Sequence, residues 1–134
     1  MTRAELVQHG FAVLGRPPSA LLPVMTDDDV RRVAHAELCG YWAYAARRPW
    51  WWLNPVIADL GLTSMARGRH ALETGQLLTK TQAIEQAHAP AWLKDQLRAR
   101  RQGQPVTSPR ARTAFIAWRD ARRTVADARR GAQA

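Results

Sequence analysis

The chain has 134 residues, of which 46% are hydrophobic and 23% charged, so it has the length of one domain and not the composition of a disordered protein. A single cysteine, Cys39, excludes an intramolecular disulfide and a zinc site built from several cysteines. The formal net charge of +9 comes mainly from residues 98–134, where ten arginines stand against Asp120 and Asp127. A basic tail of this kind is either a solvated helix face or a surface for an anionic partner.

No apolar run approaches the roughly 18–20 residues of a membrane span, and the N-terminus lacks the layout of a signal peptide. The single thiol fits a reducing compartment. We therefore expect a soluble, cytoplasmic protein without a membrane partner, folded as one domain over residues 1–134.

Two helix starts lie in the first third of the chain. Thr2-Arg-Ala-Glu5 has the spacing of a capping box and predicts a helix over residues 3–9, followed by a short extended segment over residues 10–15. Thr26 precedes three aspartates, which favour a helix N-terminus. Apolar residues then recur at helical spacing until Pro49, which forces the helix to end.

Four further helices are predicted after Pro49. Asn54-Pro55 begins the first, which ends at Thr74-Gly75, and Thr79-Lys-Thr-Gln82 begins the second. The break at Ala89-Pro90 separates a third helix, and Ser108-Pro109 begins a final helix of about twenty residues. The apolar stripe of this last helix consists of Ala114, Phe115, Trp118, Ala121, Val125 and Ala128.

These signals predict an all-α fold, a bundle of about five helices over residues 26–131 with a short extended N-terminal segment. No segment after residue 15 alternates with a period of two, as a half-buried strand would. Residues 1–25 are expected to be the extended segment and a linker.

Few residues indicate chemistry directly. The chain has no GxxxxGK[ST], GxGxxG or HExxH motif. His35 and Cys39 lie one helical turn apart, but two ligands make no structural zinc site and no third group orients a Cys–His dyad. We expect an ordinary core pair there, and the sequence predicts neither a catalytic nor a metal-binding residue.

The string Trp50-Trp51-Trp52 is the most unusual feature. Neighbouring residues on a helix point about 100° apart, so three consecutive tryptophans cannot all face one core. Either at least one of them lines a cleft, a rim or a partner surface, or the three rings together fill a helix–helix junction.

Arg67 and Lys80 form a second candidate site. Arg67 lies about two turns before the predicted helix end at Gly75, and Lys80 begins the next helix. The short connection predicts neighbouring helices, so the two cationic groups could converge on one anion in a shared concave surface. We expect aromatic residues of the 42–52 segment to form the rim of the same cleft.

The stretch from Leu60 to Ile84, with its Arg67, Thr74-Gly75 and Lys80, resembles the C-terminal helical domain of the aminoglycoside (streptomycin/spectinomycin) adenylyltransferases. The resemblance extends to residues 9–18, to Ala87-His-Ala-Pro-Ala-Trp92 and to Thr113-Ala-Phe-Ile-Ala-Trp118, and so covers nearly the whole chain. Residues 1–25 then resemble the exit strand and linker from a catalytic domain that this chain lacks.

The resemblance implies that Arg67 and Lys80 contact the phosphates of ATP. In that family a nucleotidyltransferase domain supplies the carboxylates that hold magnesium, and its signature is absent here. The expected partner is therefore a nucleotidyltransferase domain or protein that holds Mg²⁺, and the chain alone is expected to transfer no adenylyl group.

The same resemblance implies an antibiotic ligand beside the aromatic residues. The expected contacts to an aminoglycoside or aminocyclitol are Trp42, Trp50, Trp51, Trp52 and Asp59. Acidic residues of the family are replaced by Arg47 and Arg48, so a less charged ligand such as spectinomycin would meet less repulsion than a polycation.

Two other classes of function remain open. One is a non-enzymatic ligand-binding, sequestering or protein-interaction module, including a homodimer, that uses the tryptophan-rich cleft. The other is nucleic-acid binding through the last helix, which we expect to be unlikely because Phe115, Trp118 and Val125 assign one helix face to the core.

Overall fold

The computed structural model describes residues 25–133, and in this range it contains helices and no strand. The predicted all-α fold is confirmed. The predicted helix over residues 3–9 and the extended segment over residues 10–15 lie outside the described residues. The elements are α3 (Asp27–Glu37), the π-helical turn η1 (Leu38–Trp42), α4 (Ala43–Ala46), the 3-10 turn η2 (Pro49–Leu53), α5 (Pro55–Thr74), α6 (Lys80–Gln86), α7 (Ala91–Arg101) and α8 (Arg110–Gln133).

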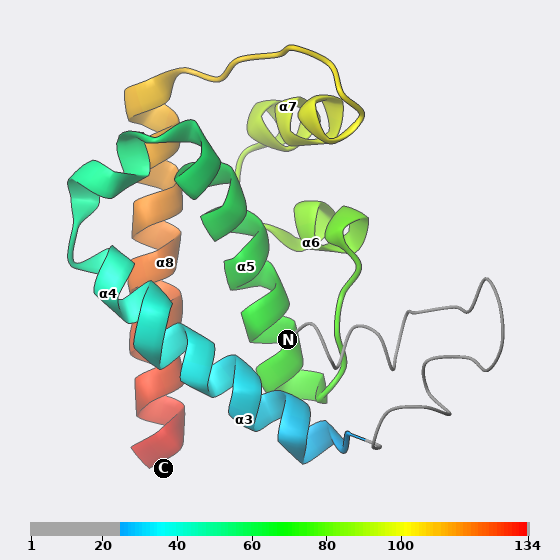
Figure 1. Cartoon of the computed structure of the whole chain (residues 1–134), viewed down its shortest axis with the longest axis vertical. Helices are drawn as coiled ribbons and strands as arrows, with labels where there is room; N and C mark the ends of the chain where they lie inside the picture. Colours follow the sequence, from blue (N-terminus) through cyan, green and yellow to red (C-terminus); the bar gives the residue numbers. More distant parts are fainter. Residues whose placement is uncertain (1–24, 134) are drawn as a thin grey trace, which may run out of the picture.

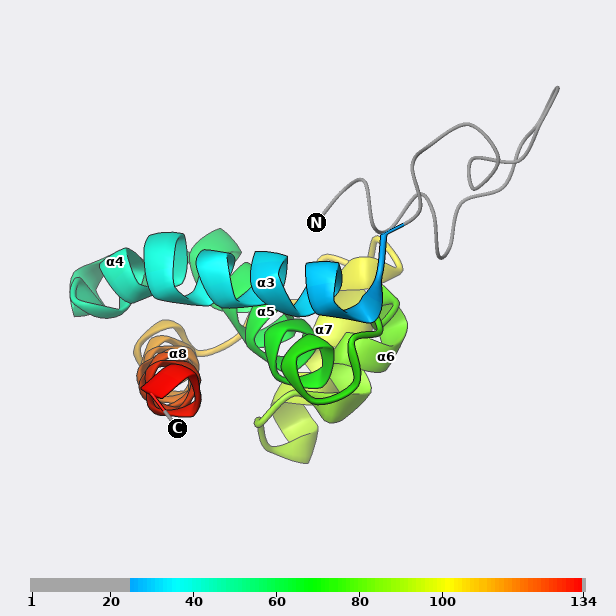
Figure 2. The ribbon, with the colours of Figure 1, turned by 90° about the horizontal axis from the view of Figure 1, so that it is seen from below.

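The long helices α5 and α8 lie side by side at the centre of the bundle (Figure 1). α3, η1 and α4 form one rod that crosses both of them on one face, and α6 and α7 pack on the side of α5 away from α8 (Figure 2). α5 therefore contacts both parts of the bundle, and α8 lies at its outer edge.

The rod is continuous, but its middle turn is wider than an α-helical turn. Its buried side chains recur every four residues at Val30, Ala34, Leu38 and Trp42. In an α-helix of 3.6 residues per turn this spacing would drift about 40° around the axis at each step. The π-helical turn at residues 38–42 compensates for the drift and keeps Trp42 facing the core.

Local sequence signals set the helix ends. The Thr26 hydroxyl accepts from the amide of Asp29, whose carboxylate accepts from the Thr26 amide. This is the capping box that the aspartates predict. Gly75 ends α5 in the left-handed region at φ 71°, and a Cβ there would overlap Asp27 at the start of α3. Gly75 therefore serves as the helix cap and also permits this close approach.

The core is built from small residues and a few large ones. Trp52 is completely buried, donates its indole N–H to the carbonyl of Ala45 at 3.0 Å, and packs directly against Gly61 of α5. Two turns further along α5, Gly68 lies against Leu38 in the same way. Gly61 lets α5 approach η2 more closely than a side chain would allow, and an added Cβ at Gly68 would press on the Leu38 side chain of η1.

The buried face of α8 differs from the predicted stripe. Phe115 is 55% exposed and Trp118 half-buried, whereas Ala114, Ala121, Val125 and Ala128 are buried as expected. The face against α5 includes three further polar residues: Thr113, Asp120 and Thr124. The expectation for Phe115 is wrong because the contact with α5 is made by small residues and by an ion pair from Asp120 to Arg69.

No helix in the described part of the chain is long and apolar enough to cross a membrane.

Candidate functional site

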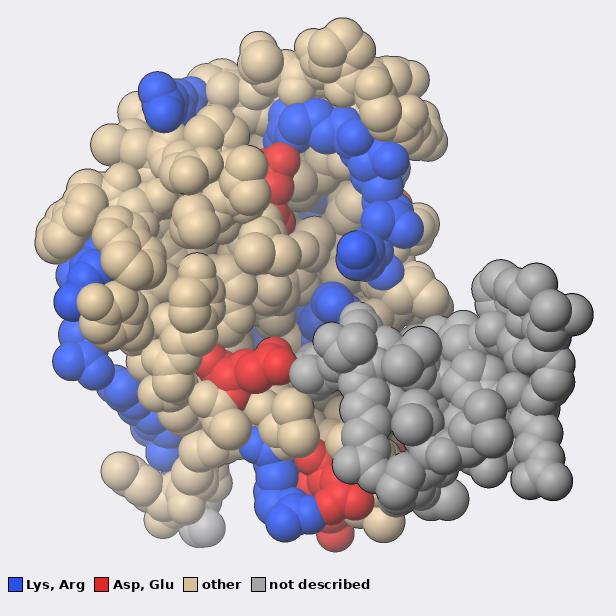
Figure 3. Space-filling view, in the orientation of Figure 1, with Lys and Arg blue, Asp and Glu red and all other residues tan. Residues whose placement is uncertain are grey.

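The candidate site is a cavity of about 420 Å³ between α5, α6 and α7, here called the basic cavity. Figure 3 shows a hollow edged by Lys and Arg side chains over these helices. The lining residues are Val56, Asp59, Leu60, Thr63, Ser64 and Arg67 of α5, Lys80 and Ile84 of α6, and Leu97, Arg100 and Arg101 of α7.

The structure brings Arg67 and Lys80 together in this cavity, as their spacing predicts. Arg67 is half-buried, and burial lowers the pKa of its guanidinium below the usual value. Its charge is therefore only partly solvated by water, so an anion that reaches it loses little to competition with solvent. Lys80 is exposed at the first residue of α6 and can reach the same space with a flexible side chain.

Lys80 contributes its side chain rather than a helix N-terminus. α6 has seven residues, and its capping box already uses the amides of Thr79 and Gln82. The Thr79 hydroxyl accepts from the Gln82 amide, and the Gln82 side chain accepts from the Thr79 amide. This cap fixes where Lys80 leaves the turn after α5.

Asp59 lies in the basic cavity but is already paired. Arg100 donates from Nε to one carboxylate oxygen at 2.7 Å and from Nη2 to the other at 3.0 Å. Its Nη1 donates to the carbonyl of Val106 at 3.1 Å and to the hydroxyl of Ser108 at 2.8 Å. Arg100 therefore joins α5, α7 and the loop before α8, and Asp59 is held away from a cationic ligand.

The tryptophans occupy three different environments. Trp42 and Trp52 are buried in the core, Trp51 is half-buried, and Trp50 is 63% exposed. The prediction that the three consecutive rings cannot share one core is confirmed. No aromatic residue of the 42–52 segment lines the basic cavity, so the expectation that they form its rim is wrong. Trp52 is committed to Gly61 and Ala45, which fixes its ring inside the bundle.

Sequence reasoning missed the contribution of α7 to the site. Arg100 and Arg101 stand in the last turn of α7, where basic residues are common because they complement the helix dipole. That general explanation accounts for both residues, so the sequence offers no reason to expect that they also line the basic cavity. Only the packing of α7 against α6 shows that Arg101 faces the same cavity as Arg67 and Lys80.

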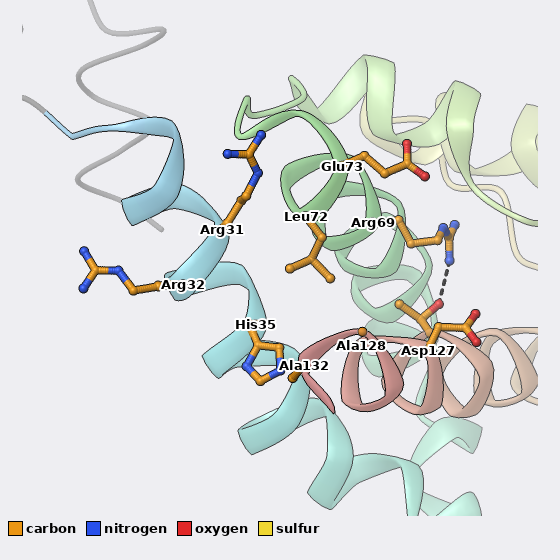
Figure 4. Close-up of a pocket in the computed structure, with 11 residues that line it drawn as sticks. Arg31, Arg32, His35, Arg69, Leu72, Glu73, Asp127, Ala128 and Ala132 are labelled. Carbon is orange, nitrogen blue, oxygen red and sulfur yellow. Dashed lines mark hydrogen bonds between the residues drawn. The ribbon is translucent and has the colours of Figure 1, made fainter. Parts of the chain in front are cut away.

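A larger cavity of about 600 Å³ lies where α3, α5 and the end of α8 meet. Figure 4 shows Arg69 directed from α5 toward α8, where it donates to the Thr124 hydroxyl at 2.7 Å. Its arginines are engaged: Arg31 pairs with Asp28, Arg32 with Asp29, and Arg69 with Asp120. Carboxylates of the described residues therefore hold all three arginines of this cavity.

The described residues contain no group of three or more His, Cys, Asp or Glu side chains that could hold a metal ion. His35 and Cys39 lie 3.5 Å apart between ring Nε2 and Sγ, as a helical pair.

Comparison of the chain with protein-family models, curated proteins and solved structures gave no match.

Proposed function

We propose that the basic cavity binds the phosphate groups of a nucleotide such as ATP, as half of a two-part adenylyltransferase-type site. The observation that carries the proposal is that Arg67, Lys80 and Arg101 line one cavity of about 420 Å³. A guanidinium fork and a mobile ammonium are the groups that bind polyphosphate oxygens in proteins.

The charge balance of the cavity supports an anionic ligand. Its lining has three arginines and one lysine against one carboxylate, Asp59, which is neutralised by Arg100 through two hydrogen bonds. Basic side chains therefore outnumber acidic ones in the lining, and a surface of that sign attracts a polyphosphate. Val56 and Leu60 add an exposed apolar edge against which a nucleoside or a partner domain could pack.

The other half of the site would come from a nucleotidyltransferase domain or protein. In the family that the sequence resembles, that domain holds Mg²⁺ through carboxylates and activates a hydroxyl of the antibiotic. We propose that an aminoglycoside or aminocyclitol binds at the junction between the two halves. This chain would then supply phosphate contacts and no group that carries out the chemistry.

Calorimetric titration of the whole chain with ATP tests the phosphate site. We expect binding by wild type and a loss of at least tenfold in affinity in Arg67→Ala/Lys80→Ala, because about 1.4 kcal/mol of contact energy corresponds to tenfold. Arg47→Ala/Arg129→Ala is the matched control, since it removes two exposed charges that do not line the basic cavity. Unchanged affinity in the double variant, or no binding of ATP by wild type, contradicts the proposal.

Titration with streptomycin and spectinomycin, with and without an upstream-encoded nucleotidyltransferase, tests the antibiotic half. We expect antibiotic binding only when the partner is present, because Asp59 is occupied by Arg100 and the buried Trp42 and Trp52 offer no surface. Antibiotic binding by the chain alone would contradict the two-part site.

A second candidate function is a non-enzymatic protein-interaction module, including a homodimer. Exposed apolar side chains follow one another along η2 and the first turns of α5, at Trp50, Leu53, Val56 and Leu60. Sedimentation measurements on wild type and Trp50→Ser/Leu53→Ser, two exposed residues that do not line the basic cavity, test it. This candidate predicts self-association that the double variant abolishes, while the nucleotide proposal predicts that the variant still binds ATP.

A further inference from the structure

The outer face of α8 forms a second basic surface, separate from the basic cavity. It is a groove of about 720 Å³, and every residue that lines it belongs to α8. α8 lies at the edge of the bundle when viewed along its axis, so one side of it packs on α5 and the rod while the other does not (Figure 2). The residues of this α8 groove are Phe115, Trp118, Arg119, Arg122, Arg123, Ala126, Asp127 and Arg130.

The charges of the α8 groove are mostly uncompensated. Arg130 pairs with Asp127, but Arg119, Arg122 and Arg123 have no ion pair with any carboxylate among residues 25–133. Arg119 lies three positions before Arg122 and four before Arg123, and like charges at these spacings repel on a helix. Elsewhere in the described structure arginines of α3 and α7 pair with carboxylates, as Arg98 does with Glu85. A linear polyanion along α8 would supply the missing negative charge.

Two aromatic rings accompany these charges. Phe115 is exposed, and its ring centroid lies 6.3 Å from that of Trp118. The indole N–H of Trp118 donates to the carbonyl of Ala46 at 2.8 Å, which fixes the ring, and the Arg122 guanidinium lies over it at 5.0 Å. An exposed ring beside a fixed ring and arginines forms a platform on which an unpaired base can stack while its phosphates meet the guanidinium groups.

We propose that the α8 groove binds single-stranded nucleic acid with little sequence preference. From Phe115 to Arg130 the helix rises about 22 Å at 1.5 Å per residue, long enough to follow several phosphates. The expectation against nucleic acid rested on Phe115, Trp118 and Val125 assigning one helix face to the core. Val125 is buried as expected, but Phe115 is exposed and Trp118 only half-buried, so both rings lie at the surface of α8. A single strand is favoured over a duplex because only unpaired bases can stack on Phe115.

Other polyanions fit the groove less well. A helix that lies in a membrane surface buries a broad apolar face in the lipid, but the apolar face of α8 packs against α5 and the rod. An acidic protein could pair with the arginines but would make no use of the exposed ring of Phe115. These partners are therefore outcomes of the test and not part of the proposal.

Fluorescence anisotropy with labelled oligothymidine and oligouridine at low salt tests the proposal on the whole chain. We expect binding by wild type and at least about a tenfold loss in Arg119→Ala/Arg122→Ala/Arg123→Ala. The slope of log affinity against log salt should fall by about 2, since each phosphate contact to a single strand contributes roughly 0.7. Phe115→Ala should weaken binding without changing that slope, because a stacking contact releases no counterion.

The matched control is Arg32→Ala/Arg47→Ala/Arg101→Ala, which has the same net charge and includes one arginine of the basic cavity. Equal loss in the control, an unaltered triple variant, or tighter binding of a duplex than of its single strand would overturn the proposal. So would equal affinity for polyglutamate or for vesicles of anionic lipid.

Circular dichroism should show unchanged helix content in all variants, because the replaced side chains are exposed or lie at the surface. ATP binding by the triple variant should persist, which separates this surface from the nucleotide site.

Discussion

At the scale of single residues, the contact between Trp52 and Gly61 determines how closely η2 approaches α5. The Trp52 ring is buried and tied to the Ala45 carbonyl, so it cannot rotate away from a new neighbour. A Cβ on Gly61 would overlap the ring atoms Cζ3 and Cη2. The glycine is therefore required by a neighbour that lies outside its own helix.

We expect Gly61→Ala to lower the free energy of unfolding by about 1–3 kcal/mol, because overpacking a well-filled core forces side chains and backbone to shift. Gly40→Ala is the control, since no atom lies within 4 Å of the added Cβ and alanine favours a helix. Urea denaturation measures both. Equal stability of the Gly61 variant and wild type would show that Trp52 can move.

Asp120 is a second residue whose environment decides its behaviour. Burial raises the pKa of its carboxyl, and this effect outweighs the attraction of Arg69 and His88. A carboxyl with a higher pKa in the folded protein holds its proton more tightly there than in the unfolded chain. The folded state then binds more protons between the two pKa values, and stability falls as pH rises through that window.

We therefore expect the free energy of unfolding of wild type to fall relative to that of Asp120→Asn as pH rises from about 4, the usual pKa of an aspartate. Urea denaturation of both proteins at a series of pH values measures the difference. If the free energy of unfolding of wild type instead rises relative to that of Asp120→Asn as pH rises, the ion pair with Arg69 outweighs burial. The sign of the slope therefore decides which effect on the Asp120 carboxyl is larger.

At the scale of elements, the cap of α6 positions Lys80, one of the cations of the proposed phosphate site. α6 is short, so the loss of its capping box leaves few hydrogen bonds to hold the first turn. The cap residue Thr79 directly precedes Lys80, and the apolar anchors of the helix are Ala83 and Ile84.

We expect Thr79→Ala to destabilise the protein by about 1 kcal/mol, the usual value for losing an N-cap hydroxyl, and to weaken ATP binding through a less ordered Lys80. Thr79→Ser should restore both properties because serine caps equally well. Denaturation and calorimetry measure the two effects. Full ATP affinity in Thr79→Ala would show that the position of Lys80 does not depend on the cap.

At the scale of the whole molecule, Arg100 joins three segments that the chain order separates. It contacts Asp59 of α5 and the loop residues Val106 and Ser108, while Ser108 also reaches Gln96 of α7 at 2.5 Å. This network closes one side of the basic cavity and sets the start of α8.

We expect Arg100→Ala to cost about 1–3 kcal/mol of unfolding free energy, because the partly buried Asp59 carboxylate and the Val106 carbonyl lose their donor. Arg101→Ala is the matched control, since it removes a neighbouring charge that has no ion pair within the described structure. It should change stability by less than about 0.5 kcal/mol. Equal stability of both variants would show that the hydrogen bonds of Arg100 contribute no more to stability than an exposed charge does.

The sequence by itself determined the positions of the helices. Thr26, Asn54 and Thr79 mark helix starts through hydrogen bonds made within three residues, and Gly75 marks an end through its own backbone angle. Signals of such short range can be read without the fold. The placement of Arg67 and Lys80 in one cavity was also predictable, because only a short turn separates α5 from α6.

Only the tertiary structure decided which side chains of those helices are buried, paired or free to act. The exposure of Phe115 and the burial of Trp52 depend on how closely α8 and η2 approach the glycine-bearing face of α5. The ion pairs of Asp59 with Arg100 and of Arg69 with Asp120 join residues 41 and 51 positions apart. Periodicity assigns residues to a helix face, but the neighbour of that face is fixed by packing between distant segments, which no local pattern records.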